Sequence, residues 1–304
     1  MKKILLFSFL FIIIPFIIIY ILIIDKSSNN FKFSKNQIVR VYRTKYNRID
    51  RIPIEQYIEG VVSGEMPISF SDEALKAQAV VSRSYIMYQI LHNKNKKFDV
   101  YDSTKSQVYL DDNQRKKNWG KKYNTYKKKI HKIVELTNGL YVTYNGNVAD
   151  TLFFSTSSGY TENSEEVFSS KLPYLKSVKS DWDKISPVFH EQNEYSIDDF
   201  CKMLHISTTS KPVIKVLSKT KAGRINKISI NNKEFTGKNI VKVFGLRSAN
   251  FTITINNNVI ITTNGFGHGV GMSQYGAEGM ARNGYKYNEI IKYYYKGVKI
   301  EKLK

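Results

Sequence analysis

The sequence has very little cysteine and lacks the usual ligand sets for metals and nucleotides. Cys201 is the single cysteine in 304 residues, so no disulfide can form within the chain, and a cysteine-based zinc site is disfavoured. The five histidines include no H-E-x-x-H motif and no close pair, which argues against a zinc enzyme. There is also no G-K-[ST] phosphate loop and no G-x-S-x-G serine motif.

Acidic residues are also scarce. The chain has 26 of them against 47 basic residues, which gives a net charge of +21. Such an excess favours polyanionic partners such as nucleic acid, anionic lipid or acidic cell-wall polymers, although an AT-rich genome would also enrich lysine. No nucleic-acid-binding module is recognisable, and the N-terminal segment described next argues against an intracellular partner. We therefore expect no nucleic acid.

The N-terminal segment has the features of a membrane anchor. Residues 4–24 form an uncharged run after the short basic tip 1–3, and at ~1.5 Å per residue they reach the ~30 Å of a bilayer core. The residues that follow contain no A-x-A-like cleavage site, so we interpret an uncleaved anchor rather than a signal peptide. The preceding lysines predict a cytoplasmic N-terminus. We expect a linker at 25–36 and one extracytoplasmic domain at 37–304.

The stretch Pro53–Pro67 predicts a helix that carries a candidate acid. Its apolar residues follow the spacing i, i+3, i+4, i+7, i+8. They are Ile54, Tyr57, Ile58, Val61 and Val62. Glu65 falls next on this stripe, and a carboxyl on a desolvated face has a raised pKa and can act as a general acid. The alternative is that Glu65 lies beyond the helix end and points into water.

The remaining patterns predict an α+β fold with helices and short antiparallel strands. Further helices are expected at 72–92, 123–136, 239–244, 273–282 and 289–296. Strands are expected at 37–43 and, around the turn Asn145-Gly146, at 140–144 and 148–154. Short alternating strands are expected within 213–263, whereas 170–212 has no clear pattern.

Two loops have the composition of ligand-lining segments. Residues 154–163 are small and polar, and residues 265–276 carry alternating glycines that allow close backbone approach to a ligand. The glycine spacing lacks the third glycine of G-x-G-x-x-G, so a dinucleotide site is not expected. His268 in the second loop is interpreted as a hydrogen-bonding residue, either structural or substrate-facing.

Several motifs in order resemble one known family. They are E-G-V-V-S-G-E-M-P (59–67), A-L-K-A-Q-A-V-V-S-R-S-Y (74–85), S-Q-V-Y (106–109), F-S-T-S-S-G-Y-T-E-N-S-E (154–165), F-G-L-R-S-A-N-F (244–251) and G-H-G-V-G-M-S-Q-Y-G-A (267–277). Together they resemble the stage II sporulation protein D family, which is related to amidase enhancer proteins.

The resemblance implies a lytic transglycosylase, a carbon–oxygen lyase that acts on peptidoglycan during forespore engulfment. It implies a protein in the mother-cell membrane that faces the forespore and works with a sporulation amidase and a multi-span membrane protein. The substrate would be glycan strands already stripped of stem peptides. Cleavage between N-acetylmuramic acid and N-acetylglucosamine would leave a 1,6-anhydro end. Glu65 corresponds to the family's catalytic acid.

The resemblance also bears on metals and on substrate binding. Some family members carry zinc ligands near the S-T-S-x-G segment, where this chain has Phe154, Thr156, Ser157 and Asn163. We therefore predict no metal and no cofactor. The expected substrate-binding residues are Ser155, Thr156, Tyr160, His268, Gln274 and Tyr275.

Two alternatives remain open at this point. A glycoside hydrolase would need a second carboxylate facing Glu65. The candidates are Asp72, Glu73, Glu162 and Glu165. The other alternative is a non-catalytic, glycan-binding activator of a cell-wall amidase.

Overall fold

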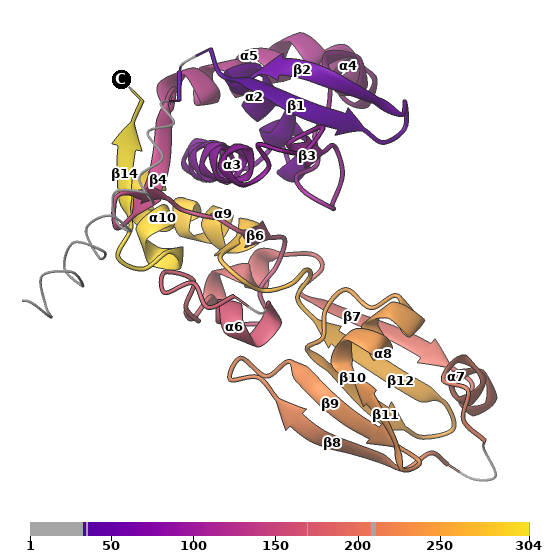
Figure 1. Cartoon of the computed structure of the whole chain (residues 1–304). Coiled ribbons are helices and arrows are strands. Elements are labelled where there is room, and N and C mark those ends of the chain that lie inside the picture. Colours follow the sequence, from indigo (N-terminus) through magenta and orange to yellow (C-terminus); the bar gives the residue numbers. More distant parts are fainter. Residues whose placement is uncertain (1–32, 35, 169, 208–210, 304) are drawn as a thin grey trace, which may run out of the picture. The chain divides into compact units, whose positions relative to one another are not determined.

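The computed structural model describes residues 33–34, 36–168, 170–207 and 211–303, and residues 35–304 form one compact unit (Figure 1). The expected tip 1–3, anchor 4–24 and most of the linker 25–36 lie outside the described residues. Within the described ranges, no helix is both long enough and apolar enough to cross a bilayer.

A long helix, α3 (Asp72–His92), forms the centre of the helical part of the unit. Small buried residues such as Ala74, Ala77 and Ala79 let neighbouring elements approach its axis closely. It contacts α2 (Ile54–Glu65), α5 (Tyr123–Leu136), α9 (Gln274–Arg282) and α10 (Tyr287–Tyr294). These helices confirm the sequence predictions, and the apolar stripe of α2 is buried as its spacing requires.

The N-terminal strands pack beside these helices. β1 (Ile38–Arg43) pairs antiparallel with β2 (Arg48–Pro53) and parallel with the short β3 (Val100–Tyr101). After β3 come α4 (Asp112–Trp119) and the short 3-10 turn η1 (Gly120–Lys122), which lead into α5. The parallel pair is a departure from the purely antiparallel strands that we expected.

The predicted hairpin forms, but its second strand is shorter than predicted. β4 (Leu140–Tyr144) pairs with β5 (Asn147–Val148) across Asn145 and Gly146, whose φ angles of 50° and 77° suit this tight turn. β4 also pairs with β14 (Lys299–Lys302). Beyond Val148 the chain leaves the hairpin. It then forms β6 (Phe153–Phe154), which pairs parallel with β13 (Met272–Ser273) and so brings the two predicted loops together.

Residues 190–264, here called the β-region, carry a hydrophobic cluster of their own. One sheet has the order β10-β9-β8 and the other the order β11-β12-β7. The strands are β7 (His190–Tyr195), β8 (Ile214–Lys219), β9 (Ile225–Ile230), β10 (Lys233–Thr236), β11 (Phe251–Ile255) and β12 (Val259–Asn264). Helices α7 (Ile197–Met203) and α8 (Gly237–Phe244) contribute Phe200, Ile240 and Phe244 to the cluster.

The segment 170–212, which has no clear sequence pattern, leads from the helical part into the β-region. It contains the 3-10 helix η2 (Asp181–Ile185) and then β7, and it is preceded by the one-turn helix α6 (Ser164–Val167). The described residues therefore have the predicted α+β character.

Candidate functional site

The carboxylate of Glu65 is held by two neutral donors. Glu65 is the last residue of α2, and its Oε1 accepts a hydrogen bond of 2.6 Å from the backbone N–H of Val108. Its Oε2 accepts a 3.1 Å hydrogen bond from Nε2 of Gln274. The side chain is half-buried. Glu65 is therefore at the helix end, as the alternative interpretation assumed, but its carboxylate does not simply point into water.

Burial determines the protonation of this carboxyl. Desolvation raises the pKa of Glu65 above its usual value, and the hydrogen bonds from Val108 and Gln274 offset this only in part. No cation forms an ion pair with Glu65 among the residues that the structure describes. A carboxyl in this environment can hold a proton closer to neutral pH and can then donate it to a bound substrate.

Two glycines of α2 bring Val108 to Glu65. A Cβ on Gly64 would lie 2.6 Å from the carbonyl oxygen of Val108, and one on Gly60 would lie 2.2 Å from the ring of Tyr109. The backbone N–H of Leu110 donates to the Gly60 carbonyl at 3.1 Å. Only glycine permits this close approach. The S-Q-V-Y motif therefore packs against the helix that carries the acid.

Gln274 is the first residue of α9, whose N-cap is Ser273. The Ser273 hydroxyl accepts from the Gly276 N–H at 3.3 Å and donates its one proton to the carboxylate of Asp183, and the Ser155 carbonyl lies 3.2 Å away as a second acceptor. This capping fixes the start of α9 and so directs the Gln274 side chain toward Glu65.

Ser155 and Tyr275 lie beside this arrangement. The Tyr275 N–H donates to the Ser155 carbonyl at 3.0 Å, and the Tyr275 ring packs edge-on against Phe70 with 5.0 Å between ring centroids. Both side chains are half-buried. The structure thus brings four of the seven expected site residues together, namely Glu65, Ser155, Gln274 and Tyr275.

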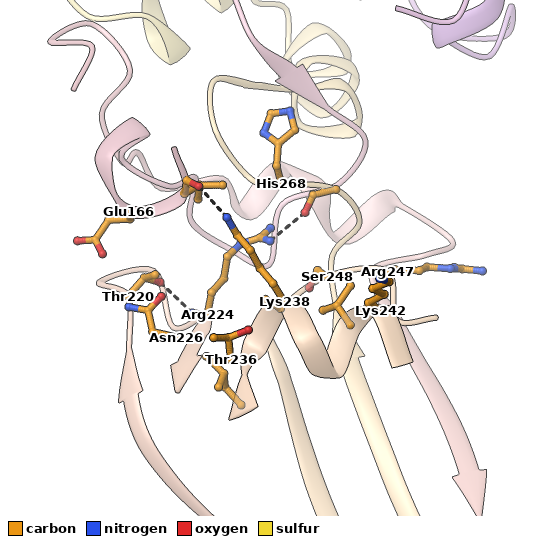
Figure 2. A pocket seen from close by; sticks show the side chains of 15 residues that line it. Glu166, Thr220, Arg224, Asn226, Thr236, Lys238, Lys242, Arg247, Ser248 and His268 are labelled. Carbon is orange, nitrogen blue, oxygen red and sulfur yellow. Dashed lines mark hydrogen bonds between the residues drawn. The ribbon is translucent and has the colours of Figure 1, made fainter. Parts of the chain in front are cut away.

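The other three expected residues occupy different positions. Thr156 is fully buried, and its hydroxyl bonds that of Ser186 at 2.9 Å, so it stabilises the loop from inside. Tyr160 is exposed and forms a β-bridge with Lys179. His268 lines a separate cavity with Arg224 (Figure 2).

His268 has the surroundings of a neutral imidazole. Burial, with a further contribution from the charge of Arg224, lowers its pKa to about 4. Its Nδ1 accepts a 3.1 Å hydrogen bond from the Val270 N–H. Across the described residues, no group of three or more His, Cys, Asp or Glu side chains is arranged to hold a metal ion.

The structure reveals two titratable residues that the sequence reasoning missed. Burial raises the pKa of Tyr85 on α3 to about 12, with added effects from the charges of Asp150 and Glu65. Burial also raises the pKa of Asp150 to about 6, and its Oδ1 has no hydrogen-bond partner within the described chain. A signal for Tyr85 was present, because Gln78, Ser82 and Tyr85 recur at helical spacing as polar groups on a buried helix.

The four candidate second carboxylates are engaged elsewhere. Asp72 pairs with Lys129, Glu73 with Lys76, Glu165 with Lys176, and Glu162 accepts from Thr220. Among the described residues, none of them shares a hydrogen bond with Glu65 or with its two donors. None of these four is therefore placed as a second carboxylate for Glu65.

Comparison with known proteins agrees with the motifs. A family profile described as "Stage II sporulation protein" matches residues 42–144. Stage II sporulation protein D of Bacillus subtilis (strain 168) is 42% identical over 86% of this chain and 78% of its own length. The protein of that name from Bacillus amyloliquefaciens is also 42% identical, over the same shares of the two chains. An amidase enhancer of Bacillus subtilis is 28% identical over 79% of this chain but only 39% of its own.

These matches show that the chain belongs to the stage II sporulation proteins. More narrowly, the identity and coverage show that it belongs to the stage II sporulation protein D family, with amidase enhancer as a more distant relative.

Proposed function

We propose that this chain is a lytic transglycosylase that cleaves peptidoglycan glycan strands with Glu65 as its one acid and base. The observation that carries the proposal is the Glu65 carboxyl itself. It has a raised pKa and neutral hydrogen-bond donors, and each of the other candidate carboxylates is engaged elsewhere. A transglycosylase needs one such group, whereas the usual hydrolases need two facing carboxylates.

The proposed reaction has two proton transfers. Protonated Glu65 gives its proton to the glycosidic oxygen as the bond to C1 of the N-acetylmuramic acid unit breaks. The Glu65 carboxylate then removes the proton of the C6 hydroxyl of the same sugar, and O6 forms a bond to C1. The product is a 1,6-anhydro ring, and no water is consumed. The intramolecular nucleophile gains from proximity, and the Val108 and Gln274 donors stabilise the carboxylate formed between the two transfers.

The biological setting is part of the same proposal. Family membership supports a role in sporulation, and the amidase enhancer relative supports cooperation with a cell-wall amidase. We place the protein in the mother-cell membrane through residues 4–24, with residues 37–304 outside and facing the forespore. A multi-span membrane protein completes the proposed complex, and the substrate is glycan stripped of stem peptides.

The test uses the full-length chain in detergent and purified glycan strands with and without stem peptides. Products are analysed by mass spectrometry for wild type and for Glu65→Gln. We expect anhydro-ended fragments from the wild type alone. Reducing-end products would instead identify a hydrolase.

A second candidate function is favoured by the likeness to an amidase enhancer. In that case folded wild-type protein would not cleave glycan. It would raise the activity of the partner amidase, and Glu65→Gln would raise it equally.

A further inference from the structure

A cavity of about 500 Å³ lies where the glycine loop meets the β-region (Figure 2). Gly267 and His268 line it from the loop, and Thr236 and Lys238 line it from the start of α8. No step of the proposed cleavage uses these residues. The cavity is therefore a feature in addition to the site around Glu65.

Basic side chains dominate the charge of this cavity. Arg224, Lys238, Lys242 and Arg247 line it, against the single carboxylate of Glu166. Arg247 is compensated, because its Nη2 pairs with Glu191 outside the cavity at 3.0 Å. Arg224 is also compensated in part, because its Nε lies 3.5 Å from the buried carboxylate of Glu162, so the uncompensated charge available to a ligand comes from Lys238 and Lys242.

The two lysines are one helical turn apart on α8. Nζ of Lys238 donates to the Val167 carbonyl at 3.0 Å. Among the described residues, neither Lys238 nor Lys242 has an ion pair with a carboxylate. Like charges at this spacing repel each other and weaken a helix. An anion bound between them would remove that repulsion.

Arg224 presents a third cation from the inside of the cavity. Its side chain is buried, and its Nη1 donates to the Gly267 carbonyl at 2.9 Å. Its Nε lies 3.5 Å from Glu162 and has no hydrogen-bond partner in the described chain. A guanidinium has five N–H donors, so Arg224 keeps donors in reserve for an anionic ligand. Figure 2 shows the Arg224 side chain below His268.

The remaining walls are apolar or neutral. Val167, Ile225, Val241 and Ala249 contribute apolar surface, and Thr236 caps the positive end of the eight-residue α8. Cations combined with apolar walls suit a carboxylate on a small, partly apolar body. A guanidinium matches a carboxylate in particular, because its parallel N–H groups can bond both oxygens.

We infer that this cavity binds a carboxylate carried by a glycan, namely the lactyl carboxylate of a muramic acid unit. The identification of the sugar rests on the proposed function, whereas the anion site itself rests on the cations described here. A stem peptide is attached to that lactyl group through an amide, which carries no charge. Its removal by an amidase leaves a free carboxylate. The cavity therefore gives the protein a means of distinguishing stripped strands from peptide-bearing ones.

The test measures binding by ligand-observed NMR with the full-length Glu65→Gln chain, so that cleavage plays no part. N-acetylmuramic acid, its methyl ester and N-acetylglucosamine are titrated in parallel. We expect the free acid to bind ~tenfold more tightly than the other two, as is typical of a hydrogen bond to a charged group. Equal binding of the ester would overturn the assignment.

Two further ligands test whether the cavity is selective for a muramyl carboxylate over other anions. Inorganic phosphate that binds as tightly as the free acid would show a general anion site. D-alanyl-D-alanine that binds more tightly would show a peptide site. Either result would overturn the assignment to a muramyl carboxylate.

Paired variants locate the site. Lys238→Gln with Lys242→Gln removes two charges from the cavity, and Lys202→Gln with Lys215→Gln removes two exposed charges from the same β-region outside it. We expect ~tenfold weaker binding of the acid in the first pair only. Equal effects of the two pairs would contradict the inference. If wild type fails to cleave glycan but this binding pattern holds, the anion site stands and the transglycosylase proposal does not.

Discussion

Glu65 is half-buried and Arg224 is buried, and the groups that surround these two charged residues are of opposite kinds. Neutral donors hold the Glu65 carboxylate, and no cation pairs with it among the described residues. Arg224 pairs with the carboxylate of Glu162 at 3.5 Å and lines a cavity with Lys238 and Lys242, neither of which has an ion pair within the described part of the chain. Neutral neighbours leave the pKa of Glu65 raised by burial, whereas a cation beside it would lower that pKa and favour the carboxylate. A group that must bind an ion keeps its charge, and burial lowers the pKa of Arg224 only to about 10.

The largest expected effect on glycan cleavage comes from removing the acid. Glu65→Gln keeps the shape of the side chain but cannot donate a proton, so cleavage should fall by ~10²–10⁴-fold, the contribution typical of a general acid. The rate is measured as release of soluble fragments from glycan. Glu234→Gln on exposed β10 is the control and should keep full activity. If Glu65→Gln retained activity, the proton donor would be another group.

The next largest effect on cleavage is expected from the close packing of Gly64 against Val108. Gly64→Ala places a methyl group 2.6 Å from the Val108 carbonyl, so the segment that donates to Glu65 must move. Overpacking of this kind costs ~1–3 kcal/mol of folding free energy, and we expect cleavage to fall further than this destabilisation explains. Thermal unfolding and the cleavage rate are compared on the same samples. Ser63→Ala in the same helix should change both only slightly. A stable, fully active Gly64→Ala would show that the close approach is not needed.

Asp150 tests how the ionisation of a third desolvated residue affects the stability of the fold. Burial raises the pKa of Asp150 to about 6 from 3.8, so the folded state binds its proton more tightly than the unfolded state does. Its charge therefore destabilises the fold as pH rises from about 4 to about 6, and the penalty is complete above that range. Asp150→Asn should remove up to ~3 kcal/mol of this penalty at pH 7.5 and change little at pH 4. Unfolding in urea at both pH values measures the difference. Equal stabilisation at both would exclude a charge effect.

Local patterns in the sequence predicted much of the fold. The stripe of α2, the full length of α3 and the turn at Asn145-Gly146 depend on residues a few positions apart, so they could be predicted from the sequence alone. β7 (His190–Tyr195) could not be predicted, because H-E-Q-N-E-Y has no apolar face. Its backbone pairing with β12 holds it in place.

The candidate site was predicted less completely, for a physical reason. Glu65 was found because it interrupts an apolar stripe, but its partners Val108 and Gln274 are 43 and 209 residues away along the chain. Only tertiary packing brings them together. His268 and Gln274 share one glycine-rich motif, yet the Gln274 side chain bonds the acid, whereas the His268 ring packs against Phe154 and Phe168 at the edge of the basic cavity.

The smallest expected effect concerns the pH dependence of the acid. The Gln274 hydrogen bond stabilises the Glu65 carboxylate and so lowers a pKa that burial has raised. Gln274→Met keeps the volume but removes the donor, so the pKa of Glu65 should rise further. Because the first step needs the protonated acid, activity falls as pH rises through this pKa, and the falling limb of the pH profile should move to higher pH. The cleavage rate is measured from pH 4 to pH 9, with Gln192→Met on exposed β7 as the control. A shift to lower pH would mean that Gln274 holds the protonated form, and the neutral surroundings of Glu65 would then need a different explanation.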